Sequence, residues 1–172
     1  SECVAVGSRA LKAHTSGARN SALGSEAATA VTTAADITAI GRSGLAACTT
    51  GNSNTGLGSK SLMTLTTGAQ NTAIGCQAGD NLTTGNQNTY VGDNAGNTHA
   101  TGTNCVFIGH GANCSTNSVD TEITLGVGAG GKGTRTFFVN SDHGVYHGGN
   151  TTTWSTTSDE RIKKNIANNN VG

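Results

Sequence analysis

The stretch Asn71-Thr-Ala-Ile-Gly-Cys-Gln-Ala78 returns seventeen residues later as Asn88-Thr-Tyr-Val-Gly-Asp-Asn-Ala95. The same spacing relates eight glycines, called the ladder glycines below: Gly7, Gly24, Gly41, Gly58, Gly75, Gly92, Gly109 and Gly126. A strict short period over most of a chain is typical of stacked structural repeats, each in contact with its neighbours. The sequence therefore predicts a parallel β-roll or β-helix solenoid of eight 17-residue coils rather than one globular core.

The residues around each ladder glycine also repeat by type. A branched aliphatic residue always precedes the glycine, and the residues two before and three after it are mostly small, as Ala73 and Ala78 are around Gly75. A threonine pair and a second glycine follow, as in Thr66-Thr67-Gly68. Threonine, valine and isoleucine favour strands, whereas glycine and asparagine favour corners with positive φ. We expect an all-β coil with two short strands, one corner at the ladder glycine, and a second corner at the second glycine or the asparagine.

Composition indicates that one copy of such a solenoid buries little apolar area. Hydrophobic residues make up 34% of the chain and aromatic residues 3%. Ordering the backbone costs about 1–2 kcal/mol per residue, which thin coils of this composition offset poorly. The small residues at fixed positions favour the close approach of another backbone. The sequence therefore predicts a parallel homo-oligomer, a homotrimer in which one face of each roll turns toward a shared axis.

The charge balance excludes several classes of partner. Charged residues are 12% of the chain and the formal net charge is zero, which gives no electrostatic basis for binding nucleic acid or a membrane surface. Disordered chains usually carry more charge and lack a strict period, so disorder is the weaker alternative. No apolar run is long enough to span a bilayer.

Cysteine and histidine positions predict no metal or cofactor site. The five cysteines are scattered and have no ligand spacing. Cys105 and Cys114 could bridge across one coil, or all five could be free thiols. His143 and His147 are four residues apart in a glycine-rich stretch. The segment 126–132 is rich in glycine and ends in lysine, but it lacks the spacing of a phosphate-binding loop.

The chain changes character after residue 133. The segments 134–140 and 144–147 have strand composition, and residues 141–143 suit a turn between them. Thr157 and Glu160 form a capping box that predicts the start of a helix. The expected organisation is a β-roll at 1–133, a β-strand connector at 134–157, and the truncated start of another domain at 158–172.

The residues Ser158-Asp-Glu-Arg-Ile-Lys-Lys-Asn-Ile166 resemble the opening motif of the intramolecular chaperone domain, the peptidase S74 family, found at the C-termini of phage tail fibres and tailspikes. The run 149–155 is similar to the segment that leads into it. The 17-residue repeats resemble the head repeats of trimeric autotransporter adhesins, which are trimers of parallel β-rolls. The resemblance implies that the chaperone domain assists trimer folding and then cleaves itself off, with Ser158 as nucleophile and Lys163 as base.

Two functions follow from these observations. The first is a structural virion protein, a trimeric tail fibre segment on the exterior of the virion. Its expected partners are other tail proteins and a host cell-surface glycan or outer-membrane component. The alternative is a bacterial adhesin head. Apart from self-cleavage at Ser158, we expect no enzymatic activity. The candidate receptor contacts are Arg42, Lys60, Gln77, Asp93 and His110. The alternative is a merely solvated face, which is the more frequent role of any single exposed polar residue.

Overall fold

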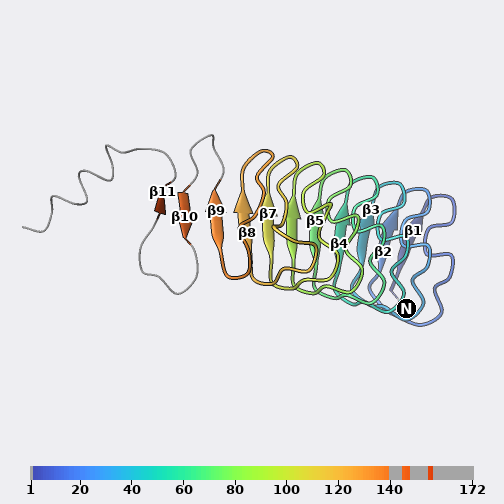
Figure 1. Ribbon diagram of the computed structural model, residues 1–172. Helices are drawn as coiled ribbons and strands as arrows, with labels where there is room; N and C mark the ends of the chain where they lie inside the picture. Colours follow the sequence, from blue (N-terminus) through green and yellow to red (C-terminus); the bar gives the residue numbers. More distant parts are fainter. Residues whose placement is uncertain (1, 140–144, 148–154, 157–172) are drawn as a thin grey trace, which may run out of the picture.

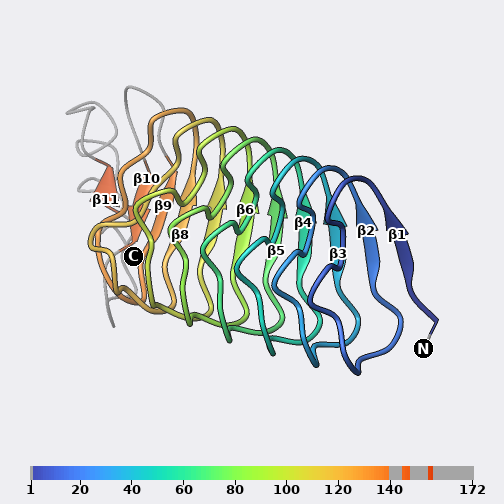
Figure 2. The ribbon, with the colours of Figure 1, turned by 90° about the vertical axis from the view of Figure 1, so that its right-hand side faces the viewer.

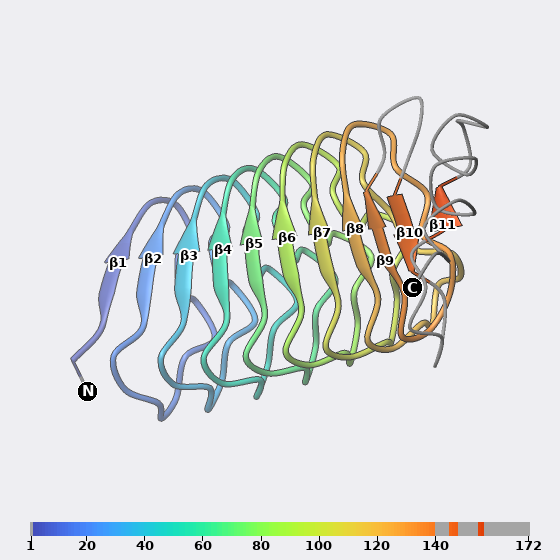
Figure 3. The same cartoon turned by 90° about the vertical axis from the view of Figure 1, so that its left-hand side faces the viewer.

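The computed structural model describes residues 2–139, 145–147 and 155–156, and it shows a row of stacked coils (Figure 1). Each coil contributes one short strand to a single sheet whose strand order follows the chain. Figure 3 shows these strands side by side, and Figure 2 shows that successive coils keep a similar outline. The strands are β1 (Val4–Val6), β2 (Ser21–Leu23), β3 (Thr38–Ile40), β4 (Thr55–Leu57), β5 (Thr72–Ile74), β6 (Thr89–Val91), β7 (Val106–Ile108), β8 (Ile123–Leu125), β9 (Phe137–Val139), β10 (Val145–His147) and β11 (Ser155–Thr156).

The strand register confirms the all-β solenoid. Strands β1 to β9 are parallel, and from β1 to β8 each residue pairs with the one seventeen positions later, as Thr72 does with Thr89. The next coil is shorter, because Thr124 pairs with Phe138. Strand β10 then pairs antiparallel with β9, as expected for the segments 134–140 and 144–147. The helix expected at Thr157 lies outside the described residues.

The second strand expected in each coil is wrong. The residues after each ladder glycine from Gly7 to Gly92 form consecutive turns, because the second and fourth of them adopt left-handed backbone conformations. Lys60 has φ 59° and Leu62 has φ 49°. A pleated strand requires negative φ at every position, so this segment cannot extend as one. The coils still bond to one another here: the Leu45 amide donates to the Ser61 carbonyl at 2.9 Å.

The first expected corner is confirmed, whereas the second, at the second glycine or the asparagine, is corrected. The ladder glycines do have positive φ, such as 138° at Gly75. The asparagine does not form a corner, because the left-handed residue is the one before it, such as Gln70 with φ 61°. The second glycine is required for space instead: a Cβ on Gly51 would lie 2.0 Å from the Gly68 carbonyl oxygen of the next coil.

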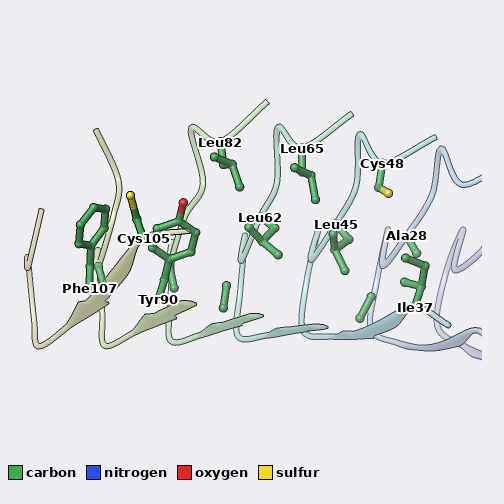
Figure 4. Packing of buried hydrophobic residues seen from close by; sticks show 14 of the residues in the cluster. Ala28, Ile37, Leu45, Cys48, Leu62, Leu65, Leu82, Tyr90, Cys105 and Phe107 are labelled. Carbon is green, nitrogen blue, oxygen red and sulfur yellow. The ribbon is translucent and has the colours of Figure 1, made fainter. Parts of the chain in front are cut away.

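The core lies inside the stack of coils. The middle residue of each strand from β2 to β9 is buried and points inward, as Ala73 does. Leucines from the turns pack above these residues in two rows, with Leu45 and Leu62 in one and Leu65 and Leu82 in the other (Figure 4). The small residues therefore pack within the chain's own coil, and they give no reason for a second backbone to approach.

Candidate interaction surface

The outward face of the strands exposes a continuous row of aliphatic side chains. In each strand the residue before the ladder glycine points away from the core. We call this row the aliphatic stripe: Val6, Leu23, Ile40, Leu57, Ile74, Val91, Ile108 and Leu125. Six of its members are between 36% and 53% exposed, and Val91 and Leu125 are half-buried. A contiguous exposed apolar patch marks an interaction site on a protein surface.

A second column runs parallel to the aliphatic stripe. It consists of the first residue of each strand, which is threonine in β3 to β6 and is half-buried there. Parallel in-register pairing places like residues above one another at about 4.8 Å. The face is thus a regular lattice of methyl and hydroxyl groups rather than a pocket, which suits a long partner that follows the same axis.

A buried asparagine ladder holds this face rigid from behind. The Asn71 side-chain oxygen accepts a hydrogen bond from the Asn88 amide at 3.0 Å, and its side-chain nitrogen donates to the Gly85 carbonyl at 2.9 Å. Asn54 and Asn88 make the equivalent bonds to their next coils. Each asparagine precedes a strand, so these bonds fix the height and register of the strands that present the stripe.

An aromatic cluster fills the interior of the later coils. The Tyr90 hydroxyl lies 2.7 Å from His99 Nδ1, and His99 Nε2 lies 2.9 Å from the Val119 carbonyl oxygen. The carbonyl can only accept, so His99 carries a proton on Nε2, and in the neutral imidazole Tyr90 donates to Nδ1. Phe107 packs edge-on against His99 with centroids 5.3 Å apart. Burial lowers the pKa of His99.

A buried carboxylate marks the point where the repeat shortens. Glu122 is fully buried and occupies the position that asparagine holds in earlier coils. It accepts hydrogen bonds from the Ser115 amide at 3.0 Å and the Gly133 amide at 2.6 Å. Two backbone donors thus compensate part of the cost of its burial. Its role is to join the irregular turns of the last coils.

The structure places the candidate receptor contacts on successive coils and brings only two of them together. Arg42, Asp93 and His110 are exposed, whereas Lys60 and Gln77 are half-buried. The imidazole of His110 lies 3.5 Å from the Asp93 carboxylate. The candidate self-cleavage residues Ser158 and Lys163 lie outside the described residues.

The cysteines form no disulfide. All five are free, including Cys105 and Cys114, so the bridge considered from the sequence is not formed. Burial raises the pKa of Cys105 to about 11, which keeps its thiol protonated. The part of the chain that the structure describes contains no group of three side chains able to hold a metal ion. The side chains of His143 and His147 lie outside that part.

Sequence reasoning identified the aliphatic position but not its exposure. The alternation in Thr72-Ala73-Ile74 separates two faces, and the inward face could have been assigned to alanine had the leucines of the turns been recognised as its packing partners. No family model, curated protein or solved structure matches the chain. No helix within the described ranges has the length and hydropathy needed to cross a bilayer.

Proposed function

We propose that this chain is a segment of a trimeric fibre, in which the aliphatic stripes of three parallel copies pack around a shared axis. The exposed stripe along the strand face is the observation that supports this proposal. Fully burying a valine, leucine or isoleucine stabilises by about 1.5–3 kcal/mol, so half-exposed members contribute about 1 kcal/mol each. The stripe runs the length of the rod, and its sum is comparable with the cost of association, about 4–15 kcal/mol.

The proposed role is structural and adhesive. The fibre is a virion component, a tail fibre segment, whose outward turns contact a host cell-surface glycan or outer-membrane component and whose ends join other tail proteins. The Ser158–Ile166 motif favours this role over a bacterial adhesin head, which the repeats alone would support equally well. In this proposal the segment from Ser158 begins a chaperone that assists trimer assembly and then cleaves itself off.

Light scattering after size exclusion tests the assembly. We expect a mass three times the 17.1 kDa of the chain. Ile74→Asp places a charge at the middle of the stripe, and it should dissociate the assembly because the carboxylate would be buried without a partner. Thr67→Asp is the matched control, since Thr67 is exposed and lies outside the strand face. A monomeric wild-type chain would refute the proposal.

Two further measurements test the remaining parts. A chain that carries a complete chaperone domain from Ser158 onward should lose that domain after synthesis, and Ser158→Ala should abolish the loss. Continued cleavage of this variant would show that Ser158 is not the nucleophile. Binding of the labelled oligomer to an array of bacterial surface glycans, or to intact outer membranes, tests adhesion. Absence of binding to both would leave a purely structural fibre.

A further inference from the structure

The strand face has two polar edges, one on each side of the aliphatic stripe. The leading edge is the exposed residue five positions before each ladder glycine, and the trailing edge is the pair of residues one and two positions after it. Each coil contributes one leading-edge residue and one trailing-edge pair. We call these residues of one coil a level, and levels are counted from the N-terminus. The leading edge is Glu2, Arg19, Asp36, Ser53, Gln70, Gln87, Asn104 and Thr121.

The charges on the two edges are opposite at each of the first three levels. Glu2 shares a coil with Arg9 in the first level. In the second level the signs are reversed, with Arg19 on the leading edge and Glu26 on the trailing edge. The third level returns to the first pattern, with Asp36 leading and Arg42 trailing. The two edges are therefore complementary level by level.

The charges also alternate along each edge, where they form pairs within the chain. Arg19 donates to both carboxylate oxygens of Asp36, at 2.6 and 2.8 Å, and Arg9 lies 3.2 Å from Glu26. These side chains remain between 42% and 61% exposed. Carboxylates have further acceptor sites and guanidinium groups further donors, so each pair can bond to a neighbouring copy as well.

We propose that the leading edge of one copy lies against the trailing edge of the next copy, with the two rods parallel and at zero axial offset. This inference rests on the proposed self-assembly through the aliphatic stripe, and it specifies the register of that assembly. A shift of one coil would place Glu2 beside Glu26 and Arg19 beside Arg42, and only Asp36 would meet an opposite charge, that of Lys60. A shift the other way would place Arg19 beside Arg9 and Asp36 beside Glu26.

Zero offset has a consequence for the type of assembly. A head-to-tail contact closes into a ring when the rotation closes without translation, and it otherwise grows as an open filament. Zero offset has opposite charges at all three charged levels, whereas one shift has like charges at two of three levels and the other has them at both, so the pattern selects the closed ring. The later levels do not counteract this choice, because the leading edge from Ser53 onward is uncharged.

Charge inversion tests the complementarity. The trailing-edge variant Arg9→Glu/Glu26→Arg/Arg42→Glu keeps the pairing within the chain but makes each level like-charged between copies. We expect its association to weaken at least tenfold at low salt, and less at high salt because exposed charges are screened. The leading-edge variant Glu2→Arg/Arg19→Glu/Asp36→Arg should behave in the same way. Circular dichroism confirms that each variant keeps its fold.

The variant with all six substitutions is the decisive control. It restores opposite charges at every level, so its association should return to within about threefold of the wild type. A six-substitution variant that associates no better than the two triple variants would overturn the inference. If the wild-type chain is oligomeric and none of the variants changes its association, the register inference fails while the proposed assembly stands. A monomeric wild-type chain would refute both the register inference and the proposed assembly.

Disulfide trapping reads the register directly, in a Cys76→Ser background that removes the exposed thiol. The same-level pair Arg19→Cys/Glu26→Cys should give a covalent oligomer on mild oxidation. The shifted pair Arg19→Cys/Arg42→Cys should not; the same-level pair leaves two complementary levels intact and the shifted pair leaves one. Preferential trapping of the shifted pair would overturn the inference.

Discussion

The strand and the turns share the interior volume of each coil, so a large residue on one side is matched by a small residue on the other. In the middle coils the strand contributes a small residue, such as Ala73, while the turn contributes a leucine such as Leu62. At Tyr90 this arrangement is reversed. A Cβ on Gly79 would lie 2.7 Å from the Tyr90 ring, and one on Gly96 would lie 2.2 Å from it. Both turns have therefore given up the leucine position so that the ring fits between them.

Tyr90→Ala should destabilise the fold by about 3–5 kcal/mol, because it leaves a cavity that two glycines cannot fill. Adding Gly79→Leu should recover part of this loss, since Leu62 adopts the same left-handed conformation at the equivalent position. Urea denaturation measures both effects. Gly79→Leu alone is the control, and it should be destabilising because the ring occupies the space. A loss below 1 kcal/mol for Tyr90→Ala would contradict this account.

The buried imidazole of His99 predicts acid sensitivity. Its pKa is lowered in the folded chain, chiefly by burial, so the folded state binds fewer protons than the unfolded state. The stabilisation is complete above the unfolded-state value of about 6.5 and is lost as the pH falls below it. The urea midpoint should thus decrease between pH 7 and pH 5. His99→Gln should reduce this slope.

At the scale of the coil, the asparagine ladder replaces the hydrogen bonds that a longer strand would supply. Three-residue strands leave the segment before each strand unpaired by regular sheet bonds. Asn54, Asn71 and Asn88 satisfy the backbone there and bond to one another. The ladder is interrupted where Ile37 and Cys105 stand at the same position. We therefore expect register to be most firmly fixed in the central coils.

Asn71→Ala should lower the free energy of unfolding by about 2–4 kcal/mol. The substitution removes the acceptor of the Asn88 backbone amide and the donor to the Gly85 carbonyl. Urea denaturation checks the magnitude, and hydrogen exchange should locate the loss of protection in β5 and β6. Thr67→Ala, an exposed substitution in the same coil, should stay within about 0.5 kcal/mol of the wild type. Equal effects for the two variants would exclude a special role for the ladder.

Glycine spacing and strand composition were sufficient to predict the period, the strand positions and the parallel order. They were insufficient for the turns, because propensity scales give no indication that Leu45 or Leu62 would adopt positive φ. Only stacking on identical neighbours stabilises that conformation. For the same reason the inward leucines were missed and the aliphatic stripe was not recognised as exposed. Ser158 and Lys163 remain predictions.

Over residues 2–139 the chain is a one-dimensional stack in which each strand contacts only the strand before and the strand after it. Stability in such a stack is approximately the sum of coil and interface contributions. Register between coils is set by spacing along the chain, since a shift of one residue turns every inward side chain outward. The unit that can be removed without damage is therefore seventeen residues, wherever the cut falls within the regular part.

Deleting residues 59–75 joins Gly58 to Cys76 and should give a folded rod that is shorter by one coil. Solution scattering should show a decrease of about 4.8 Å in length, with an unchanged circular dichroism spectrum per residue. The first three charged levels remain, so the association should persist. Deleting the sixteen residues 60–75 removes almost the same mass but breaks the register, and it should abolish cooperative unfolding. Equal tolerance of the two deletions would show that the coils do not depend on the 17-residue spacing.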